Sequence, residues 1–185
     1  MRTILDTGSY GEYLHYGMPL VLVAVLDEHG RVNVSTNASS TPLPGEPSRL
    51  VIGVLKDNLT SRLIAERGEF SINLLTPGMW HIARYCGYTT GQDHDKVAEC
   101  DLHTLPAQFV QTPLIRECPL NIECVVNETK DLSDLMLFIA EIKAIQVADA
   151  WSNSRAGVDM GKYDPLIYAF GYAFARGQRV GPSAL

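Results

Sequence analysis

The longest uninterrupted run of apolar residues in this 185-residue chain covers only seven positions, from Leu20 to Leu26. A helix that spans a membrane needs about 20 such residues, and a core helix needs at least about 10. The run is rich in Val and Leu, and its length favours a buried β-strand. The sequence therefore predicts a soluble chain built from short strands.

Several further segments have the length and apolar pattern of strands. A turn at residues 27–30 follows the first strand and makes a β-hairpin with the second. A polar connection is expected at residues 127–134, between the two longest strand segments. The expected strands after the first are Arg31 to Thr36, Leu50 to Leu55, Glu69 to Leu75, Asn121 to Val126, Leu135 to Val147 and Leu166 to Phe170.

Helix signals are few and short. Asn58 or Thr60 can cap a helix that ends at Gly68, and Pro77 can open a second helix that runs to about Cys86. One helical turn is expected between residues 93 and 99. Residues 37–48 contain three prolines, which exclude a helix or an interior strand, so we expect a loop there.

The order of these elements predicts the fold class. Six or seven strands mostly follow one another directly, with two or three short helices between them. This order favours a mainly β, antiparallel barrel over a sheet with alternating helices. No linker or repeat divides the chain, so we expect one domain over residues 1–185, with irregular segments at 1–18 and 176–185.

Charge and missing motifs exclude several functions. Fifteen basic and 21 acidic residues give a net charge of −6, so we expect neither nucleic acid nor an anionic membrane as a partner. No signal-peptide segment opens the chain, and four cysteines without C-x-x-C spacing favour reduced thiols in the cytoplasm. We assign no metal ligand and no catalytic nucleophile. Without a Rossmann or P-loop motif, any nicotinamide cofactor must bind in another way.

The segment from Lys56 to Ser61 lies where an expected strand ends and a helix begins. Free backbone N–H groups, the hydroxyls of Thr60 and Ser61 and the ammonium of Lys56 could together hold a phosphate group. The alternative is that this segment is only the cap of a helix.

A second polar cluster runs from Ser35 to Thr41, at the end of the expected strand Arg31 to Thr36. Its small side chains would let a flat ring lie on the backbone, and its hydroxyl and amide groups would bond the ring edge. The alternative is an ordinary loop. Two such clusters on adjacent strands favour a binding site.

Six stretches of the chain, spread from about Gly17 to Gly171, match one family pattern in order and spacing. They are Pro19 to Val23, Asn33 to Ser40, Lys56 to Ser61, Gly68 to Leu75, Gly87 to Lys96 and Asp164 to Tyr168. On these residues the chain resembles the flavin reductase-like proteins of the FMN-binding split-barrel superfamily, which include flavoredoxin and NAD(P)H:FMN oxidoreductases. Three features depart from the pattern: Thr41-Pro42 replaces a common aromatic residue, and Gln92 and His94 stand in a segment that is commonly Ser-Gly-Arg-Asp-Val-Asp-Lys.

The resemblance implies a split barrel that forms a homodimer with FMN near the interface. It implies that residues 37–40 line the isoalloxazine ring, that the 56–61 segment holds the phosphate, and that Lys96 lies near the flavin. With the two polar clusters, the candidate FMN-binding residues are Ser35, Thr36, Asn37, Ala38, Ser39, Ser40, Lys56, Asn58, Thr60, Ser61 and Lys96.

The function expected from the resemblance is an FMN-dependent oxidoreductase of the flavin reductase type. NADH or NADPH would pass a hydride to the flavin, which would pass electrons to free flavin, a ferric complex or a redox partner protein. The alternative is a non-catalytic, FMN-binding electron carrier that serves a protein partner. A barrel that has lost its flavin is a third possibility, against which Lys56, Thr60 and Ser61 argue.

Overall fold

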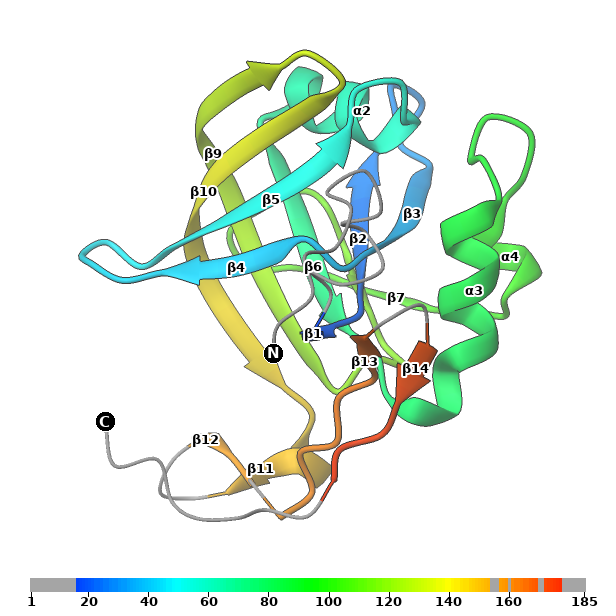
Figure 1. Ribbon diagram of the computed structural model, residues 1–185, viewed down its shortest axis with the longest axis vertical. Coiled ribbons are helices and arrows are strands. Elements are labelled where there is room, and N and C mark those ends of the chain that lie inside the picture. The colour runs from blue at the N-terminus through cyan, green and yellow to red at the C-terminus, as the bar shows by residue number, and fades with distance from the viewer. Residues whose placement is uncertain (1–15, 154–156, 160, 170–171, 178–185) are drawn as a thin grey trace, which may run out of the picture.

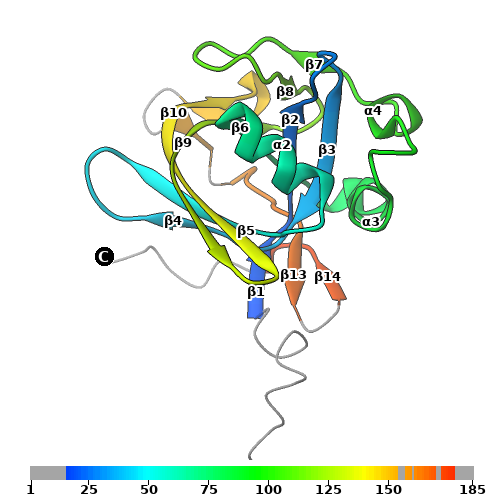
Figure 2. The same ribbon diagram turned by 90° about the horizontal axis from the view of Figure 1, so that it is seen from above.

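Seven strands form one continuous antiparallel sheet in this computed structural model, which describes residues 16–153, 157–159, 161–169 and 172–177 (Figure 1). The end strands of the sheet, β3 and β4, follow each other along the chain, so the sheet curls into a barrel (Figure 2). This confirms the predicted mainly β antiparallel barrel. In sheet order the strands are β3 (Val32–Asn37), β2 (Val21–Leu26), β6 (Glu69–Leu74), β9 (Leu120–Leu132), β10 (Leu135–Val147), β5 (Arg49–Leu55) and β4 (Ser40–Leu43).

Three small sheets complete the described part of the chain. A three-stranded sheet joins the beginning of that part to its end, and two ladders of two short strands lie between. These strands are β1 (Tyr16–Pro19), β13 (Ile167–Ala169) and β14 (Tyr172–Phe174), then β7 (Thr104–Leu105) with β8 (Leu114–Ile115), and β11 (Ser152–Asn153) with β12 (Gly157–Val158).

The seven-residue apolar run is explained by burial on both faces of β2. Val21, Val23 and Val25 point into the barrel core, which also holds Phe70 and Phe138. Side chains at alternate positions of the run, residues 22 and 24, belong to a second core outside the barrel. Because both faces are covered, the strand carries no polar position, as is usual for strands that are buried on both sides.

The helices shield these two cores from solvent. Helix α2 (Leu59–Arg67) lies across one end of the barrel (Figures 1 and 2) and buries Leu63 and Ile64. Of the two predicted caps, Asn58 is the one observed, and it accepts a hydrogen bond from the Thr60 N–H (2.9 Å); as predicted, Gly68 ends the helix, at a φ of 69°. Helix α3 (Trp80–Tyr88), preceded by a 3₁₀ turn at Pro77–Met79, covers the second core, and α4 (Lys96–Glu99) follows it.

Some expected loops contain strands. Residues 40–43, expected as part of a loop, form β4. Because β4 is an edge strand, it can contain Pro42, which has no N–H to donate to a neighbouring strand. Strand β9 continues to Leu132, so the connection expected at 127–134 shrinks to a turn at residues 133–134. The strands β1, β7, β8, β11, β12 and β14 were not expected, because they are too short to show a period. Residues 1–15 and 178–185 of the two expected irregular segments lie outside the described chain.

Two carboxylates organise the long segment between α4 and β9. Glu123 of β9 is fully buried and accepts hydrogen bonds from the N–H groups of Gln108 (3.0 Å) and Phe109 (2.6 Å). Glu69 of β6 accepts from the N–H groups of Gln111 and Thr112, both at 2.8 Å. The loop between β7 and β8 is therefore fixed by side chains of the large sheet, while β7 and β8 pair with each other.

Replacing Glu123 by Gln tests this arrangement. Burial raises the pKa of Glu123, but the N–H groups of Phe109 and Gln108 outweigh this effect and hold the pKa below its ordinary value. Loss of the charge should lower the free energy of unfolding by about 1.5–3 kcal/mol, measured by urea unfolding at neutral pH. The wild type should lose this advantage as the pH falls through the lowered pKa, so the two proteins should converge in acid.

The matched control is Glu128→Gln, which changes an exposed carboxylate on the same strand. It should leave the free energy of unfolding nearly unchanged. Equal effects of the two substitutions would contradict the role given to Glu123.

Candidate functional site

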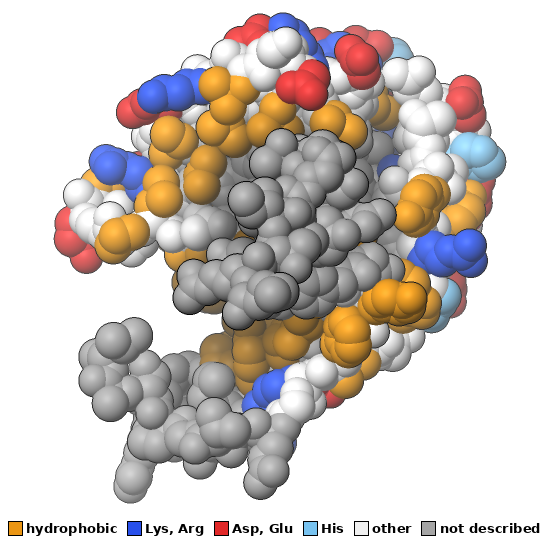
Figure 3. Space-filling model, viewed as in Figure 1, with side chains coloured by type: hydrophobic (Ala, Val, Ile, Leu, Met, Phe, Trp, Pro, Cys, Tyr) orange, Lys and Arg blue, Asp and Glu red, His pale blue; other side chains and the backbone are white. Residues whose placement is uncertain are grey.

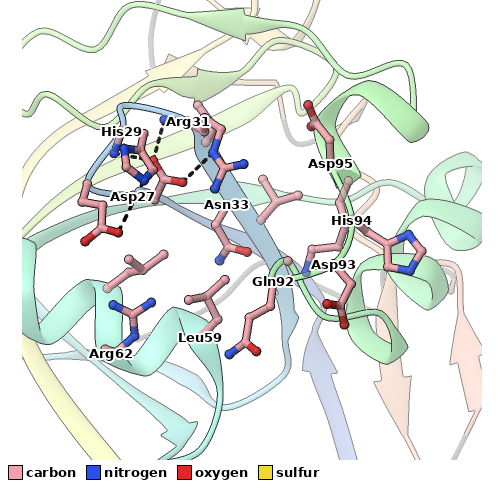
Figure 4. A pocket seen from close by; sticks show the side chains of 16 residues that line it. Asp27, His29, Arg31, Asn33, Leu59, Arg62, Gln92, Asp93, His94 and Asp95 are labelled. Carbon is pink, nitrogen blue, oxygen red and sulfur yellow. Dashed lines mark hydrogen bonds and ion pairs between the residues drawn. The ribbon is translucent and has the colours of Figure 1, made fainter.

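A cleft of about 220 Å³ opens beside α2, between β3 and the segment 91–96 that connects α3 to α4 (Figure 4). His29 and Arg31 stand on one side of it, and Asp93 and His94 stand on the other. The lining residues are Asp27, Glu28, His29, Arg31, Val32, Asn33, Val34, Leu59, Arg62, Leu63, Gly91, Gln92, Asp93, His94, Asp95 and Lys96.

Asn33 supplies an unpaired acceptor to this cleft. Its Nδ2 donates to Thr60 Oγ1 (2.9 Å), and the Thr60 hydroxyl donates to Ser35 Oγ (2.8 Å). The other amide atom, Asn33 Oδ1, is buried and accepts no hydrogen bond from any residue that the structure describes. A buried acceptor left unpaired costs about 1–3 kcal/mol, so this atom marks a place where a ligand donor would be stabilising.

Lys96 supplies a buried positive charge. Its side chain is 4% exposed, and Nζ donates to the carbonyl oxygens of Thr89 (3.0 Å) and Cys86 (3.4 Å). Within the described ranges no carboxylate lies within 4 Å of this ammonium, and burial lowers the pKa of Lys96. A buried cation without a counter-ion favours an anionic ligand, because the ligand charge would replace the lost hydration.

The other two strong cations of the cleft are already paired. Arg31 Nε lies 2.7 Å from Asp27 Oδ2, and Arg62 Nη1 lies 3.1 Å from Glu66 Oε1. Both arginines are exposed, so these pairs contribute little to stability but reduce the charge that the arginines offer to an anion. Lys96 is thus the cation of the cleft whose charge is not used by a described carboxylate.

His94 ties the 91–96 segment to both neighbouring helices. Its Nδ1 lies 3.2 Å from Glu99 Oε1 of α4 and 3.3 Å from the Tyr85 hydroxyl of α3. The Tyr85 hydroxyl also donates to the Glu99 carboxylate, which raises the pKa of Tyr85 and lowers the pKa of Glu99. His94, one of the residues that depart from the family pattern, therefore links the cleft wall to both helices.

Gly91 is required at its position by close approach. A Cβ atom at this residue would lie 2.0 Å from Asn33 Oδ1, well inside contact distance. Only a residue without a side chain lets the 91–96 segment lie against Asn33.

The structure brings together only part of the predicted cluster on β3. Ser35 lies next to the cleft through its bond with Thr60, whereas the Thr36 hydroxyl points the other way and donates to Ala83 O of α3 (2.6 Å). Asn37 Nδ2 donates to Gly53 O of β5 (2.8 Å), and Asn37 Oδ1 accepts from the Ser39 N–H (2.8 Å).

The rest of this cluster forms the crossing from β3 to β4. Ala38 packs against the second core, Ser39 is exposed and accepts from the Gly53 N–H (3.0 Å), and Ser40 opens β4 opposite Ile52. The expectation that the two polar clusters follow adjacent strands was wrong, because four strands separate β3 from β5 in the sheet. The two clusters meet through the hydrogen bond from the Thr60 hydroxyl to Ser35 Oγ, and the crossing residues Asn37 and Ser39 bond to Gly53 of β5.

The predicted phosphate cluster is also divided. Thr60 and Ser61 are buried in the first turn of α2, and Asn58 is its cap. Lys56 does not line the cleft: its ammonium is paired with Asp131 of β9. Lys96, predicted from the resemblance alone, is the lysine that the structure places in the cleft.

Sequence reasoning missed Asn33 and Gly91 as site residues. The signal for Asn33 was present, because alternation along β3 puts residues 33 and 35 on the face opposite Val32 and Val34. The signal for Gly91 is a contact between segments far apart in sequence, which no local pattern contains.

The four cysteines are free thiols, and Cys86 lies inside α3, where burial raises its pKa to about 12. Among the described residues no three metal-ligating side chains gather, and no helix is long and apolar enough to cross a membrane.

Comparison with known proteins places the chain in a family. The Flavin reductase like domain model matches residues 13–175. The chain is 27% identical to the flavoredoxin of Desulfovibrio vulgaris (TM-score 0.85, covering 91% of this chain and 92% of the other). It is also 27% identical to the flavoredoxin of Methanosarcina acetivorans (TM-score 0.88, covering 100% and 96%).

A third solved structure shows the fold alone. It is assigned as a flavin reductase with a split barrel domain from Shewanella frigidimarina, and it is 16% identical (TM-score 0.83, covering 98% of this chain and 94% of the other). The predicted split barrel is thereby confirmed. Since the family model spans most of its length, this chain is a member of the flavin reductase-like family.

Proposed function

We propose that this chain binds FMN at the cleft and acts as an oxidoreductase of the flavin reductase type, with NADH or NADPH as donor. One observation carries the proposal: in a flavin reductase-like protein, the cleft holds a buried ammonium without a described carboxylate partner. Beside it lies the unpaired acceptor of Asn33. A flavin nucleotide offers the matching groups, which are an anionic phosphate and ring N–H and ribityl O–H donors.

The residues of the cleft fit these groups in separate roles. The Lys96 ammonium would hold the negative charge of the phosphate, and Asn33 Oδ1 would accept from a ligand N–H or O–H. Thr60 and Ser35 would not need to touch the ligand, since their hydroxyls fix the orientation of the Asn33 amide. At about 220 Å³ the cleft is smaller than most ligand pockets, about 300–1,000 Å³, so it would enclose only part of the nucleotide.

Bound FMN would supply the redox chemistry, accepting a hydride from a nicotinamide and passing electrons onward. The chain would bind and orient the flavin and keep water from its buried end. Residues 37–40 stay proposed as the surface below the ring, with Asn37 holding the Ser39 backbone in place. No side-chain nucleophile is needed for this chemistry.

A second candidate function is an FMN-binding electron carrier without its own nicotinamide reaction. The observation that favours it is the identity of 27% to each of two flavoredoxins, against 16% to the flavin reductase named above. Both candidates share the FMN site and the proposed homodimer, with a redox partner protein as a further proposed partner, and they differ in the electron donor.

Absorbance spectra of the purified protein distinguish these candidates. After addition of FMN under anaerobic conditions, the reductase should show flavin bands that bleach on addition of NADH or NADPH. Bleaching only with dithionite would favour the carrier. A protein that shows no flavin bands and binds no added FMN would contradict both.

Replacing Lys96 by Met should weaken FMN binding roughly tenfold to a hundredfold, because the phosphate loses its charged hydrogen bond. Quenching of flavin fluorescence measures the dissociation constant. Burial lowers the pKa of Lys96, so the affinity of the wild type should fall as the pH rises through that value. The variant should lack this fall.

The matched control is Lys56→Met, which removes the lysine that is paired with Asp131. We expect a smaller loss of FMN affinity than for Lys96→Met. The reverse order would show that the phosphate lies at the 56–61 segment rather than at the cleft.

Replacing Gly91 by Ala should displace either the 91–96 segment or Asn33, since the new Cβ would lie 2.0 Å from Asn33 Oδ1. We expect at least tenfold weaker FMN binding and faster amide hydrogen exchange in this segment, because a displaced segment no longer holds Lys96 in place. Gly78→Ala, where a Cβ has no neighbour within 4 Å, is the control. Unchanged exchange and affinity in Gly91→Ala would contradict the described packing.

A further inference from the structure

A second concave surface lies outside the cleft, along the exposed side of α3. This groove has a volume of about 620 Å³, within the range of small-molecule sites. Trp80, Arg84 and Tyr88 follow each other at four-residue intervals and therefore share one face of the helix. Its lining residues are Trp80, His81, Arg84, Tyr85, Tyr88 and Thr89.

The two aromatic side chains present free ring surface. Trp80 is 42% exposed and Tyr88 is 90% exposed, although large aromatic side chains are normally mostly buried. Figure 3 shows apolar side chains gathered over α3, with a basic side chain among them. Exposed rings of this kind are suited to stack against a flat base, an interaction of about 1–3 kcal/mol per base.

Arg84 stands between these rings without a described carboxylate partner. None of the described residues that line the groove is acidic, and no described carboxylate lies within 4 Å of the Arg84 guanidinium. Glu99, which reaches Tyr85 from α4, is bonded to Tyr85 and His94 instead. A planar guanidinium with free donors is the usual partner of phosphate oxygens, which it can bind through two hydrogen bonds.

The groove lies beside one wall of the cleft. Helix α3 runs from Trp80 toward the segment that lines the cleft (Figure 1), and Tyr85 of the groove contacts His94 of the cleft. Trp80 and Tyr88 are eight residues apart, about 12 Å along the axis. A ligand with its base on Trp80 and phosphates on Arg84 would thus extend past Tyr88 toward the cleft.

We propose that this groove binds the ADP-ribose half of the nicotinamide dinucleotide that donates electrons, an inference that rests on the proposed reductase function. Adenine stacks on Trp80, the diphosphate pairs with Arg84, and the nicotinamide half extends past Tyr88. This site supplies the dinucleotide contacts that a Rossmann motif, absent from the sequence, would otherwise provide. A protein partner fits less well, because the concavity has small-molecule size and lies beside the cleft.

Calorimetric titration of the flavin-free protein with ADP-ribose tests the site without any flavin chemistry. Arg84→Gln should weaken ADP-ribose binding about tenfold, the loss expected for a charged hydrogen bond. Arg116→Gln, which changes an exposed arginine outside the groove, should bind ADP-ribose like the wild type. In steady-state assays with FMN, Arg84→Gln should raise KM for NADH by a similar factor, with kcat and FMN affinity unchanged.

The outcomes separate this inference from the proposed function. If NADH bleaches bound FMN but ADP-ribose does not bind, or binds Arg84→Gln as tightly as Arg116→Gln, the groove is not the dinucleotide site and the reductase stands. If ADP-ribose binds through Arg84 but NADH leaves the flavin oxidised, the site stands and the reductase proposal fails.

Discussion

Burial of β2 on both faces is the constraint on which the rest of the structure depends. The inner face of this strand contributes three valines to the barrel core, and its outer face requires a cover of its own. That cover is α3, whose Ile82, Ala83 and Cys86 pack in the second core. Since α3 is fixed there, the segment that follows it must pass along β3 and α2, and the cleft forms where it does.

The cleft is built from buried polar groups that are only partly satisfied. Most buried polar side chains of the described chain find partners, as Glu123 does with backbone N–H groups. At the cleft, Asn33 Oδ1 has no described partner, and Lys96, whose ammonium donates to two backbone carbonyl oxygens, has no described carboxylate to balance its charge. Such local departures from good packing are expected at functional sites, where a ligand supplies the missing partners.

How far the sequence predicts the fold and the site depends on whether the signal is local. Local signals were reliable: the cap at Asn58, the stop at Gly68 and the short apolar runs all mark elements that the structure confirms. Predictions that needed tertiary information were weaker. Lys56 and Lys96 are equally basic in sequence, and only the fold pairs the first with Asp131 and buries the second. The contact of Gly91 with Asn33 joins segments that only the folded chain brings together.

A basic side chain that is paired with a carboxylate is a poor candidate for binding an anionic ligand. An unpaired one needs a further observation before it becomes a good candidate. Arg31, Arg62 and Lys56 are exposed and paired with carboxylates, so their charges are largely balanced within the chain. Lack of a partner alone is not informative, because an exposed cation is well solvated by water. Lys96 carries information because it is buried, and Arg84 because two exposed aromatic rings share its groove. Neither positive charge has a described carboxylate partner, and an anion of matching form is the physical complement.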